Sequence, residues 1–169
     1  AAKAVKVTWD HGKNARLNSD ELMAATVERS KQWGQPHEKK GDARDALDAA
    51  GDQVIEAVYT GPYLAHACME PMNATAHVEP NRVTVWGGTQ FQSGIVGTLA
   101  GLCGVSRDQV TVHTTFLGGG FGRRSCLDFT IEAALISKRL GKPVQVIWSR
   151  EQDTAGGYYR PLMVARMKA

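Results

Sequence analysis

The segment Gly118-Gly119-Gly120-Phe121-Gly122 is the part of this sequence best suited to hold a ligand. Glycine has no side chain, so a ligand can approach the backbone N–H groups of such a loop closely. Arg123 and Arg124 follow directly and add positive charge. With a strand expected before it and a helix after it, the segment predicts a cradle for an anion such as a phosphate or pyrophosphate. A tight turn that needs glycine only for its backbone conformation is the alternative.

The loop matches neither of two common nucleotide-binding motifs. A dinucleotide fingerprint has a third glycine three positions after the second, where this sequence has Arg123 after Gly120. A P-loop ends in Gly-Lys-Ser/Thr, whereas this loop continues as Gly122-Arg123-Arg124-Ser125. The sequence therefore argues against nucleoside triphosphate chemistry.

A second candidate site residue is Gln90, in the segment Gly87-Gly88-Thr89-Gln90. This segment is expected where a strand ends and a helix begins, so that Gln90 would project from the first helical turn. A primary amide can donate a hydrogen bond to a metal-bound oxygen or accept one from a substrate N–H group. A helix cap or an ordinary surface residue is the alternative for Gln90 taken alone.

A third candidate is the distinctive segment of residues 62–73, which contains His66 and Glu70. These two could be metal ligands four residues apart, but Pro71 argues against a regular helix, and one histidine with one glutamate is an incomplete site. A buried, hydrogen-bonded scaffold loop is the preferred interpretation. The cysteines Cys68, Cys103 and Cys126 lie far apart and form no C-x-x-C pair, so they are expected to be packing thiols, and no metal ligand is assigned.

The elements that would position these residues alternate between strands and helices. Gly104 and Gly141 are expected to end two helices, Asp42 to cap a third, and residues 79–81 to turn a hairpin. Arg124, Asp128 and Glu132 are expected as a charged stripe on the last helix. The pattern predicts an α/β (α+β) fold, a mixed β-sheet with packed helices. Strands are expected at residues 5–9, 54–59, 74–78, 82–86, 110–117 and 144–148, and helices at residues 18–33, 43–50, 91–103 and 127–140.

Composition excludes several classes of protein. The 169 residues are 43% hydrophobic and 22% charged, which is typical of a globular domain. The net charge of +3 is too weak to favour nucleic acid as a partner, and no apolar run reaches the roughly 20 residues of a membrane span. The polar residues 34–41 predict a linker. Two parts are therefore expected: residues 1–41, a strand-helix segment that ends in this linker, and residues 42–169, a partial domain. Both ends of the chain are expected to be cut from something longer.

In order along the chain, these motifs resemble the large, molybdopterin-binding subunit of the xanthine oxidase family. The double arginine and the His-Ala-x-Met-Glu-Pro segment resemble the isoquinoline 1-oxidoreductase beta-subunit branch most closely. The similarity runs from about Val54 to the end. The motifs are Tyr63-Leu64-Ala65-His66 with Met69-Glu70-Pro71, Gly88-Thr89-Gln90, residues 118–124, Ser149-Arg150-Glu151-Gln152-Asp153 and Tyr159-Arg160-Pro161.

The resemblance implies part of a molybdenum-binding domain, with the metal held by the dithiolene of molybdopterin rather than by protein thiolates. It implies that Gln90 is a catalytic residue, the one such residue expected in this chain, and that it hydrogen-bonds an oxygen on molybdenum. Whether the pterin is a dinucleotide does not follow, and the chain by itself is expected to bind no cofactor and to be inactive. The cofactor-contacting residues that the resemblance implies are Gly88, Thr89, Gln90, Gly119, Gly120, Phe121, Gly122 and Arg123.

The activity implied is oxidation of an N-heterocycle or an aldehyde with oxygen from water. The partners implied are the remainder of the subunit and a small 2Fe-2S subunit. Xanthine oxidases carry Gly-Lys-Glu where this chain has Arg123, Arg124 and Ser125, which argues against a purine substrate. The family's catalytic glutamate is expected beyond Ala169. The competing hypothesis is a non-enzymatic domain whose glycine loop binds an anionic ligand or a partner chain.

Overall fold

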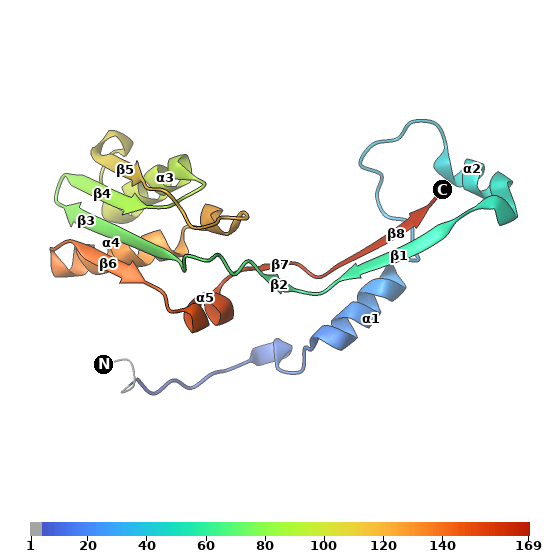
Figure 1. Cartoon of the computed structure of the whole chain (residues 1–169), viewed down its shortest axis with the longest axis horizontal. Coiled ribbons are helices and arrows are strands. Elements are labelled where there is room, and N and C mark those ends of the chain that lie inside the picture. The colour runs from blue at the N-terminus through green and yellow to red at the C-terminus, as the bar shows by residue number, and fades with distance from the viewer. Residues whose placement is uncertain (1–4) are drawn as a thin grey trace. The chain divides into compact units, whose positions relative to one another are not determined.

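The computed structural model describes residues 5–169, which divide into two compact units (Figure 1). One consists of residues 65–160 and is called here the sheet unit. The other consists of residues up to 64 together with residues 161–169 and is called the ribbon unit. The candidate segments at residues 87–90 and 118–122 lie in the sheet unit, as do residues 65–73 of the third candidate segment.

The sheet unit is built on a four-stranded mixed sheet with the order β5-β4-β3-β6. β3 and β4 form an antiparallel hairpin in which Glu79 pairs with Arg82 across Pro80 and Asn81. β6 runs antiparallel to β3, and β5 runs parallel to β4. The strands are β3 (Asn73–Glu79), β4 (Arg82–Gly87), β5 (Val110–Thr114) and β6 (Val144–Ile147).

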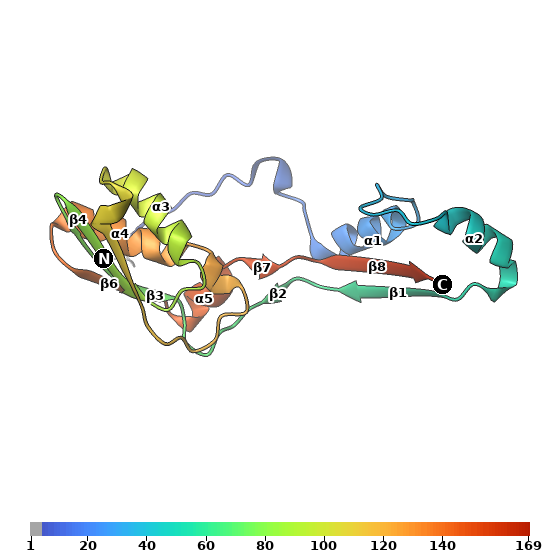
Figure 2. The same cartoon turned by 90° about the horizontal axis from the view of Figure 1, so that it is seen from above.

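Two helices, α3 (Gln92–Cys103) and α4 (Asp128–Leu140), pack on this sheet and on each other (Figure 2). Both end at a glycine in the left-handed conformation, Gly104 and Gly141, which is the residue that adopts this conformation without steric cost. α3 connects the parallel strands β4 and β5, as a parallel pair requires a crossover. The carboxyl ends of β4 and β5, at Gly87 and Thr114, therefore lie side by side.

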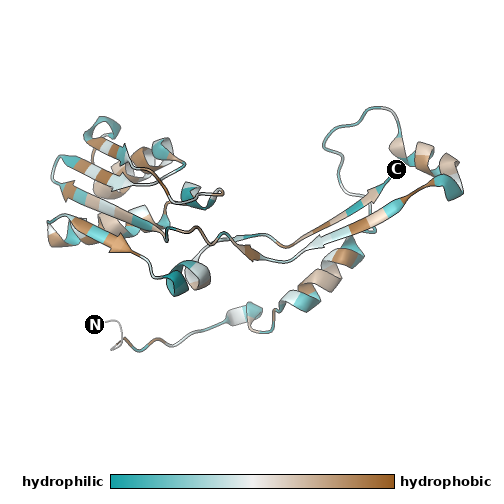
Figure 3. Cartoon of the chain, in the orientation of Figure 1, coloured by the Kyte–Doolittle hydropathy of each residue, from teal (hydrophilic) through white to brown (hydrophobic). Residues whose placement is uncertain are grey.

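The core of the sheet unit lies between the sheet and these helices. Along β3, buried residues alternate with half-buried ones, because successive side chains of a strand point to opposite faces. Figure 3 shows hydrophobic and hydrophilic residues interspersed along these elements. Ser137 is fully buried in α4, where its hydroxyl accepts from the Val78 N–H and donates to the Lys142 carbonyl. The buried hydrophobic residues are Cys68, Met72, Ala74, Ala76, Val78, Val83, Val85, Ile95, Leu99, Ala100, Val110, Phe129, Ala133 and Ala134.

Shorter elements complete the sheet unit. α5 (Arg150–Gly156) begins at a capping box in which the Ser149 side chain accepts from Gln152 N–H and the Gln152 side chain accepts from Ser149 N–H. β2 (Leu64–Ala65) pairs with β7 (Tyr159–Arg160), and single 3₁₀ turns form at Arg107–Gln109 and Arg123–Ser125. The turn at Arg123–Ser125 and the glycine loop before it belong to the candidate site.

The ribbon unit contains an antiparallel pair of strands, β1 (Glu56–Gly61) and β8 (Met163–Lys168). It also contains two helices, α1 (Ser19–Arg29), which packs against β8, and α2 (Ala43–Ala50). 3₁₀ turns form at Gly12–Asn14 and Gly51–Gln53. Glu56 forms ion pairs with Arg166 and Lys168 across the ribbon. None of its residues from 5 onward is fully buried, in contrast to the sheet unit.

Many expected elements are confirmed. The hairpin, the mixed pairing, α3, α4 and the two glycine stops occur as expected, and Asp42 caps α2 by accepting from the Arg44 and Asp45 N–H groups. Asn18 caps α1 by accepting from Glu21 N–H. Residues 163–168, whose apolar residues alternate with others in the sequence, form the strand β8. Whether residues 1–41 and 42–169 form a segment and a partial domain of a larger subunit stays a prediction.

Several expectations are wrong in their details. Residues 5–9 form no strand and their large apolar side chains are exposed, because no other strand pairs with them. The expected helix over residues 18–33 ends at Arg29. β5 stops at Thr114 rather than at residue 117, and it is a largely exposed edge strand instead of a buried one. α5, β2 and β7 were not anticipated.

The segment just before α4 holds the correction that bears most on the site. α4 begins at Asp128, within one residue of its expected start, but the expected stripe also placed Arg124 on this helix, and a 3₁₀ turn and an extended Cys126 separate the glycine loop from α4. The loop therefore does not sit at the N-terminus of a helix. Arg124 belongs to the turn and not to the expected charged stripe. Across residues 5–169, no helix combines the length and the apolar character needed to cross a bilayer.

Candidate functional site

Arg124 lies at the centre of the candidate site and is completely buried. Its guanidinium donates to three backbone carbonyls that belong to three different segments: Gly119 at 2.8 Å, Gly88 at 3.2 Å and Glu70 at 2.8 Å. A guanidinium presents several N–H donors in a fixed planar fork, which allows one side chain to join several acceptors. The three candidate segments thus meet around one arginine.

Glu70 supplies the opposite charge. One carboxylate oxygen lies 3.0 Å from the Arg124 guanidinium and accepts from the Gly118 N–H at 2.6 Å, and the other accepts from the Asn73 amide at 2.7 Å. Burial acts to raise the pKa of Glu70. The hydrogen bonds from Asn73 and Gly118 and the charge of Arg124 together outweigh burial and hold that pKa below its ordinary value. Glu70 is therefore an ionised scaffold residue, as the scaffold interpretation expected.

We predict that Glu70→Gln lowers the free energy of unfolding of the protein at pH 7 by about 1–3 kcal/mol, since it leaves Arg124 without its counter-ion and weakens the Gly118 bond. Because the folded-state pKa is lowered, the stabilisation is complete above the ordinary glutamate pKa of about 4.3 and is lost as the pH falls through the folded-state value. The difference between wild type and variant should therefore shrink below about pH 4. Denaturant unfolding from pH 7 to pH 3 measures it.

Glu79→Gln is the matched control for this prediction. The Glu79 side chain is 34% exposed, as is that of Glu70, but its partner Arg82 is 63% exposed and the pair is a surface pair. Such pairs contribute about 0–1 kcal/mol. Equal effects of the two substitutions at pH 7 would contradict the role given to Glu70.

Gln90 lies beside the glycine loop. Its side-chain oxygen accepts from the Gly122 N–H at 3.0 Å, its side chain is exposed, and its Nε2 donates to no acceptor within residues 5–169. Gln90 precedes α3 by two residues, which corrects the expectation that it stands in the first helical turn. The buried Thr89 fixes this segment, because its hydroxyl donates to the Arg124 carbonyl and accepts from the Phe91 N–H.

Close neighbours leave little room for a side chain at Gly88 and at two glycines of the loop, Gly118 and Gly120. A Cβ atom at Gly120 would lie 2.6 Å from the Gln90 side-chain oxygen, one at Gly118 would lie 2.6 Å from the Glu70 Cβ, and one at Gly88 would lie 2.7 Å from the Leu117 Cβ. Gly119 and Gly122 also have positive φ angles of 100° and 87°. The tight-turn interpretation is thus part of the explanation of these glycines.

The loop nevertheless contains N–H groups without a protein partner among residues 5–169, at the half-buried Gly119, the buried Gly120 and the exposed Phe121. In the described part of the chain, the N–H groups of Gly119, Gly120 and Phe121 donate to no protein acceptor, whereas those of Gly118 and Gly122 are bonded to Glu70 and Gln90. Phe121 has a φ of 53°, a conformation that non-glycine residues rarely adopt, and its side chain is 72% exposed. Successive unbonded N–H groups form a concavity that can bind electronegative atoms.

Arg123 does not contribute its charge to this loop. Its side chain is 2% exposed, and its guanidinium donates two hydrogen bonds to Asp128, at 3.0 and 2.7 Å. The guanidinium also makes cation–π contacts with the rings of Trp148 and Tyr158. Together with Arg124, it is committed to partners inside the protein. The expectation that both arginines add charge to an anion cradle is therefore wrong, because burial of each guanidinium requires an internal partner.

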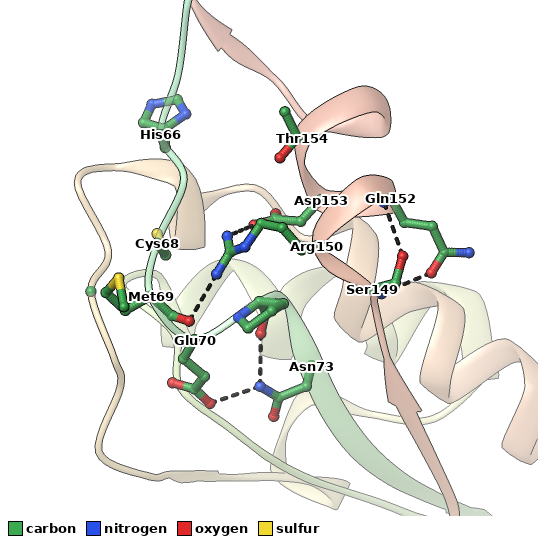
Figure 4. Close-up of polar contacts among 12 residues, drawn as sticks. His66, Cys68, Met69, Glu70, Asn73, Ser149, Arg150, Gln152, Asp153 and Thr154 are labelled. Carbon is green, nitrogen blue, oxygen red and sulfur yellow. Dashed lines mark hydrogen bonds and ion pairs between the residues drawn. The ribbon is translucent and has the colours of Figure 1, made fainter.

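The segment Ser149–Asp153 also has a structural role, shown in Figure 4. Arg150 donates to the Met69 carbonyl at 2.8 Å and pairs with Asp153 at 3.1 Å, so α5 is tied to the segment that contains Glu70. His66 makes one contact with the Tyr158 carbonyl at 3.1 Å. His66 and Glu70 thus each have separate partners, and metal ligation by the pair is not supported.

The structure therefore gathers Gly88, Thr89, Gln90 and the loop residues in one place, while the Arg123 side chain points elsewhere. Arg124 and Glu70, which are not among the expected cofactor-contacting residues, hold the site together. Both residues lie in motifs that stand out in the sequence, the segment of residues 62–73 and the glycine loop with its two arginines, but nothing in their spacing predicts that they meet. Over residues 5–169, no three potential metal-ligating side chains of His, Cys, Asp or Glu come together, and all three cysteines are free.

The fold is that of several solved oxidoreductases. Quinoline 2-oxidoreductase from Pseudomonas putida 86 superposes with a TM-score of 0.68 at 22% identity, over 86% of this chain and 20% of that one. Aldehyde oxidoreductase from Desulfovibrio gigas superposes with a TM-score of 0.65 at 19% identity, over 76% of this chain and 14% of that one.

The sequence identifies the family. Residues 25–169 match the molybdopterin cofactor-binding domain, and the chain belongs to this family. It is 36% identical over 129 residues, 74% of this chain, to the isoquinoline 1-oxidoreductase subunit beta of Brevundimonas diminuta. It is 32% identical over 99% of its length to the membrane-bound aldehyde dehydrogenase [pyrroloquinoline-quinone] of Gluconacetobacter polyoxogenes. The chain spans 16% and 22% of the lengths of these two relatives.

Proposed function

We propose that this chain forms one wall of the molybdopterin site of a molybdenum-dependent oxidoreductase, which oxidises an aldehyde or an N-heterocycle with oxygen from water. The observation that carries the proposal is the position of the exposed Gln90 amide beside three loop N–H groups with no protein acceptor. Family membership supports the identity of the cofactor. A non-enzymatic binding domain is not favoured, because the relatives are named as oxidoreductases and dehydrogenases.

The described residues fit such a cofactor. The site needs hydrogen-bond donors and close backbone approach, and it offers the Gln90 Nε2 together with the N–H groups of Gly119, Gly120 and Phe121. A side chain at Gly120 would fill the space that Gln90 occupies. Gly88 and Thr89, the two residues before Gln90, are each hydrogen-bonded to Arg124 and so hold the backbone that carries Gln90. Arg123 is proposed to take part only through its backbone, since its side chain pairs with Asp128.

The chemistry is an oxidation in which an aldehyde and water give a carboxylic acid, or a ring C–H and water give C–OH, with release of two electrons and two protons. The molybdenum of the bound cofactor would accept the two electrons. Gln90 would donate a hydrogen bond where negative charge develops, and the loop N–H groups would add fixed dipoles that need no reorganisation. The Gly122 bond holds the Gln90 oxygen, and its Nε2 stays without an acceptor among the described residues.

The proposal includes the surroundings of this wall. Relatives named as a "subunit beta" and as a "molybdenum-binding subunit" support an assembly of several subunits. We propose that the remainder of the subunit supplies the other walls and the catalytic base, and that a small 2Fe-2S subunit receives the electrons. The exposed side chains of Phe116 and Phe121 offer apolar surface for an aromatic or aliphatic substrate beside the loop.

Cofactor analysis tests the proposal. We expect the complete protein, purified from cells supplied with molybdate, to contain about one molybdenum and one pterin per chain and to reduce a dye with an aldehyde or a quinoline-type heterocycle. Cells given tungstate instead should yield folded but inactive protein. The name of one relative carries pyrroloquinoline-quinone. Protein that contains this quinone or no cofactor, and neither molybdenum nor pterin, would contradict the proposal.

A further inference from the structure

Arg124 makes contacts with every part of the proposed site. Its side chain binds the carbonyls of Glu70, Gly88 and Gly119, and its own carbonyl accepts from the Thr89 hydroxyl and from the Gln90 N–H, both at 3.2 Å. Gln90 is therefore held from its backbone by Arg124. The loop that Gln90 contacts is held by the guanidinium of the same residue.

We infer that Arg124 is a positioning residue: its guanidinium sets the separation between the Gln90 amide and the loop N–H groups on which the proposed function rests. The bond to Gly119 constrains the residue that precedes Gly120, whose N–H is one of the unbonded donors. The bond to Gly88 constrains the segment that carries Gln90. These two bonds therefore restrain the backbone on both sides of the contact between Gln90 and the loop.

The chemistry of the side chain explains why an arginine serves here. Lysine has a single nitrogen at its end, which cannot reach carbonyls on three segments at once, whereas the planar guanidinium can. A buried cation also needs a counter-ion, and the Glu70 carboxylate at 3.0 Å provides one. Arg124→Lys consequently keeps the charge and the ion pair while it removes the three-way connection.

In the complete enzyme, Arg124→Lys should lower kcat at least about tenfold with little change in KM, since displacements of about 1 Å in a site cost up to about a hundredfold in rate. The decisive measurement is a double-mutant cycle with Gln90→Ala. If Arg124 acts through Gln90, the double variant should turn over within about twofold of Gln90→Ala alone, because coupled residues are non-additive. Effects that simply multiply would overturn the inference.

Arg123→Lys is the matched control. Arg123 is the neighbouring residue, is buried to a similar degree and pairs with Asp128 rather than with the Gln90 segment. Its effect on kcat should multiply with that of Gln90→Ala. If Arg124→Lys does not fold, Thr89→Val gives the second test, since it removes the hydroxyl that bonds the Arg124 carbonyl. Its loss of kcat should also be non-additive with Gln90→Ala, and a multiplicative effect would overturn the inference.

Hydrogen exchange of the same protein separates this inference from the proposed function. Arg124→Lys should speed exchange of the Gly122 N–H, which is bonded to Gln90, by at least about tenfold, whereas Arg123→Lys should not. If the wild-type protein proves to contain neither molybdenum nor pterin, the proposed function is refuted. Faster exchange of the Gly122 N–H in Arg124→Lys would still support the positioning role in that case. Unchanged exchange at Gly122 in a folded Arg124→Lys variant would overturn that role, whatever the cofactor content.

Discussion

Replacing Gln90 with alanine is expected to slow turnover of the complete enzyme about a hundredfold, which corresponds to about 3 kcal/mol of transition-state stabilisation from one lost donor. The exposed Nε2 group has no protein acceptor within residues 5–169, so its removal leaves no buried group unpaired, and the fold should stay intact. The Gly122 N–H loses its acceptor but is at an exposed position. Steady-state kinetics with an aldehyde, together with circular dichroism, measures both effects.

Gln92→Ala is the matched control for Gln90→Ala. Gln92 is also an exposed glutamine, two residues away in α3, and its amide bonds Thr89 O at 3.4 Å and Thr114 Oγ1 at 3.2 Å rather than the loop. Its replacement should change kcat by less than about twofold, because it removes no donor from the site. A Gln90→Ala enzyme that also turns over within twofold of wild type would refute the role of Gln90.

Gly120→Val is expected to abolish cofactor binding. A Cβ atom at residue 120 would lie 2.6 Å from the Gln90 side-chain oxygen, so the valine would displace that amide from the Gly122 N–H and occupy space beside the loop donors. Gly120 does not have a positive φ angle, so the expected effect comes from this contact and not from backbone strain. Molybdenum and pterin content should fall at least about tenfold, by analogy with other lost site contacts.

Gly101→Val is the control for Gly120→Val, and thermal unfolding checks that both variants fold. Gly101 lies in α3 with no atom within 4 Å of an added Cβ, so Gly101→Val should leave the molybdenum content unchanged. Both variants should show the wild-type thermal transition within a few degrees, since a change of about 1 kcal/mol shifts Tm by only about 2–8 °C. Folded Gly120→Val protein with normal molybdenum content would show that the loop is not part of the site.

Local signals in the sequence predicted the framework of the sheet unit. The alternation on both sides of Pro80 marked the hairpin, and glycines at 104 and 141 marked the helix ends, because each signal depends on neighbouring residues alone. Residues 5–9 show the limit of such signals. Their alternation is that of a strand, but a strand needs a partner, and no described strand pairs with them.

The candidate site was predictable only in part. Gln90 and the loop glycines stood out by residue type, whereas the role of Arg124 depends on contacts with residues 36 and 54 positions away. The i, i+4 spacing from Arg124 to Asp128 and Glu132 suggested a helical stripe, and the 3₁₀ turn at Arg123–Ser125 overrides it by turning Arg124 into the interior. The spacing of Ser149 and Gln152 is that of a capping box, so the start of α5 could have been predicted from the sequence.

Locating the metal tests the central claim most directly. In crystals of the complete protein, an anomalous difference map recorded at the molybdenum absorption edge should place one peak beside the Gln90 amide and the loop of residues 118–122, with pterin density against the loop backbone. The account predicts that the side-chain nitrogen of Gln90 faces this peak, while the guanidinium of Arg123 stays paired with Asp128. A molybdenum peak remote from Gln90 and the loop, or a fully occupied enzyme with no such peak in this domain, would contradict it.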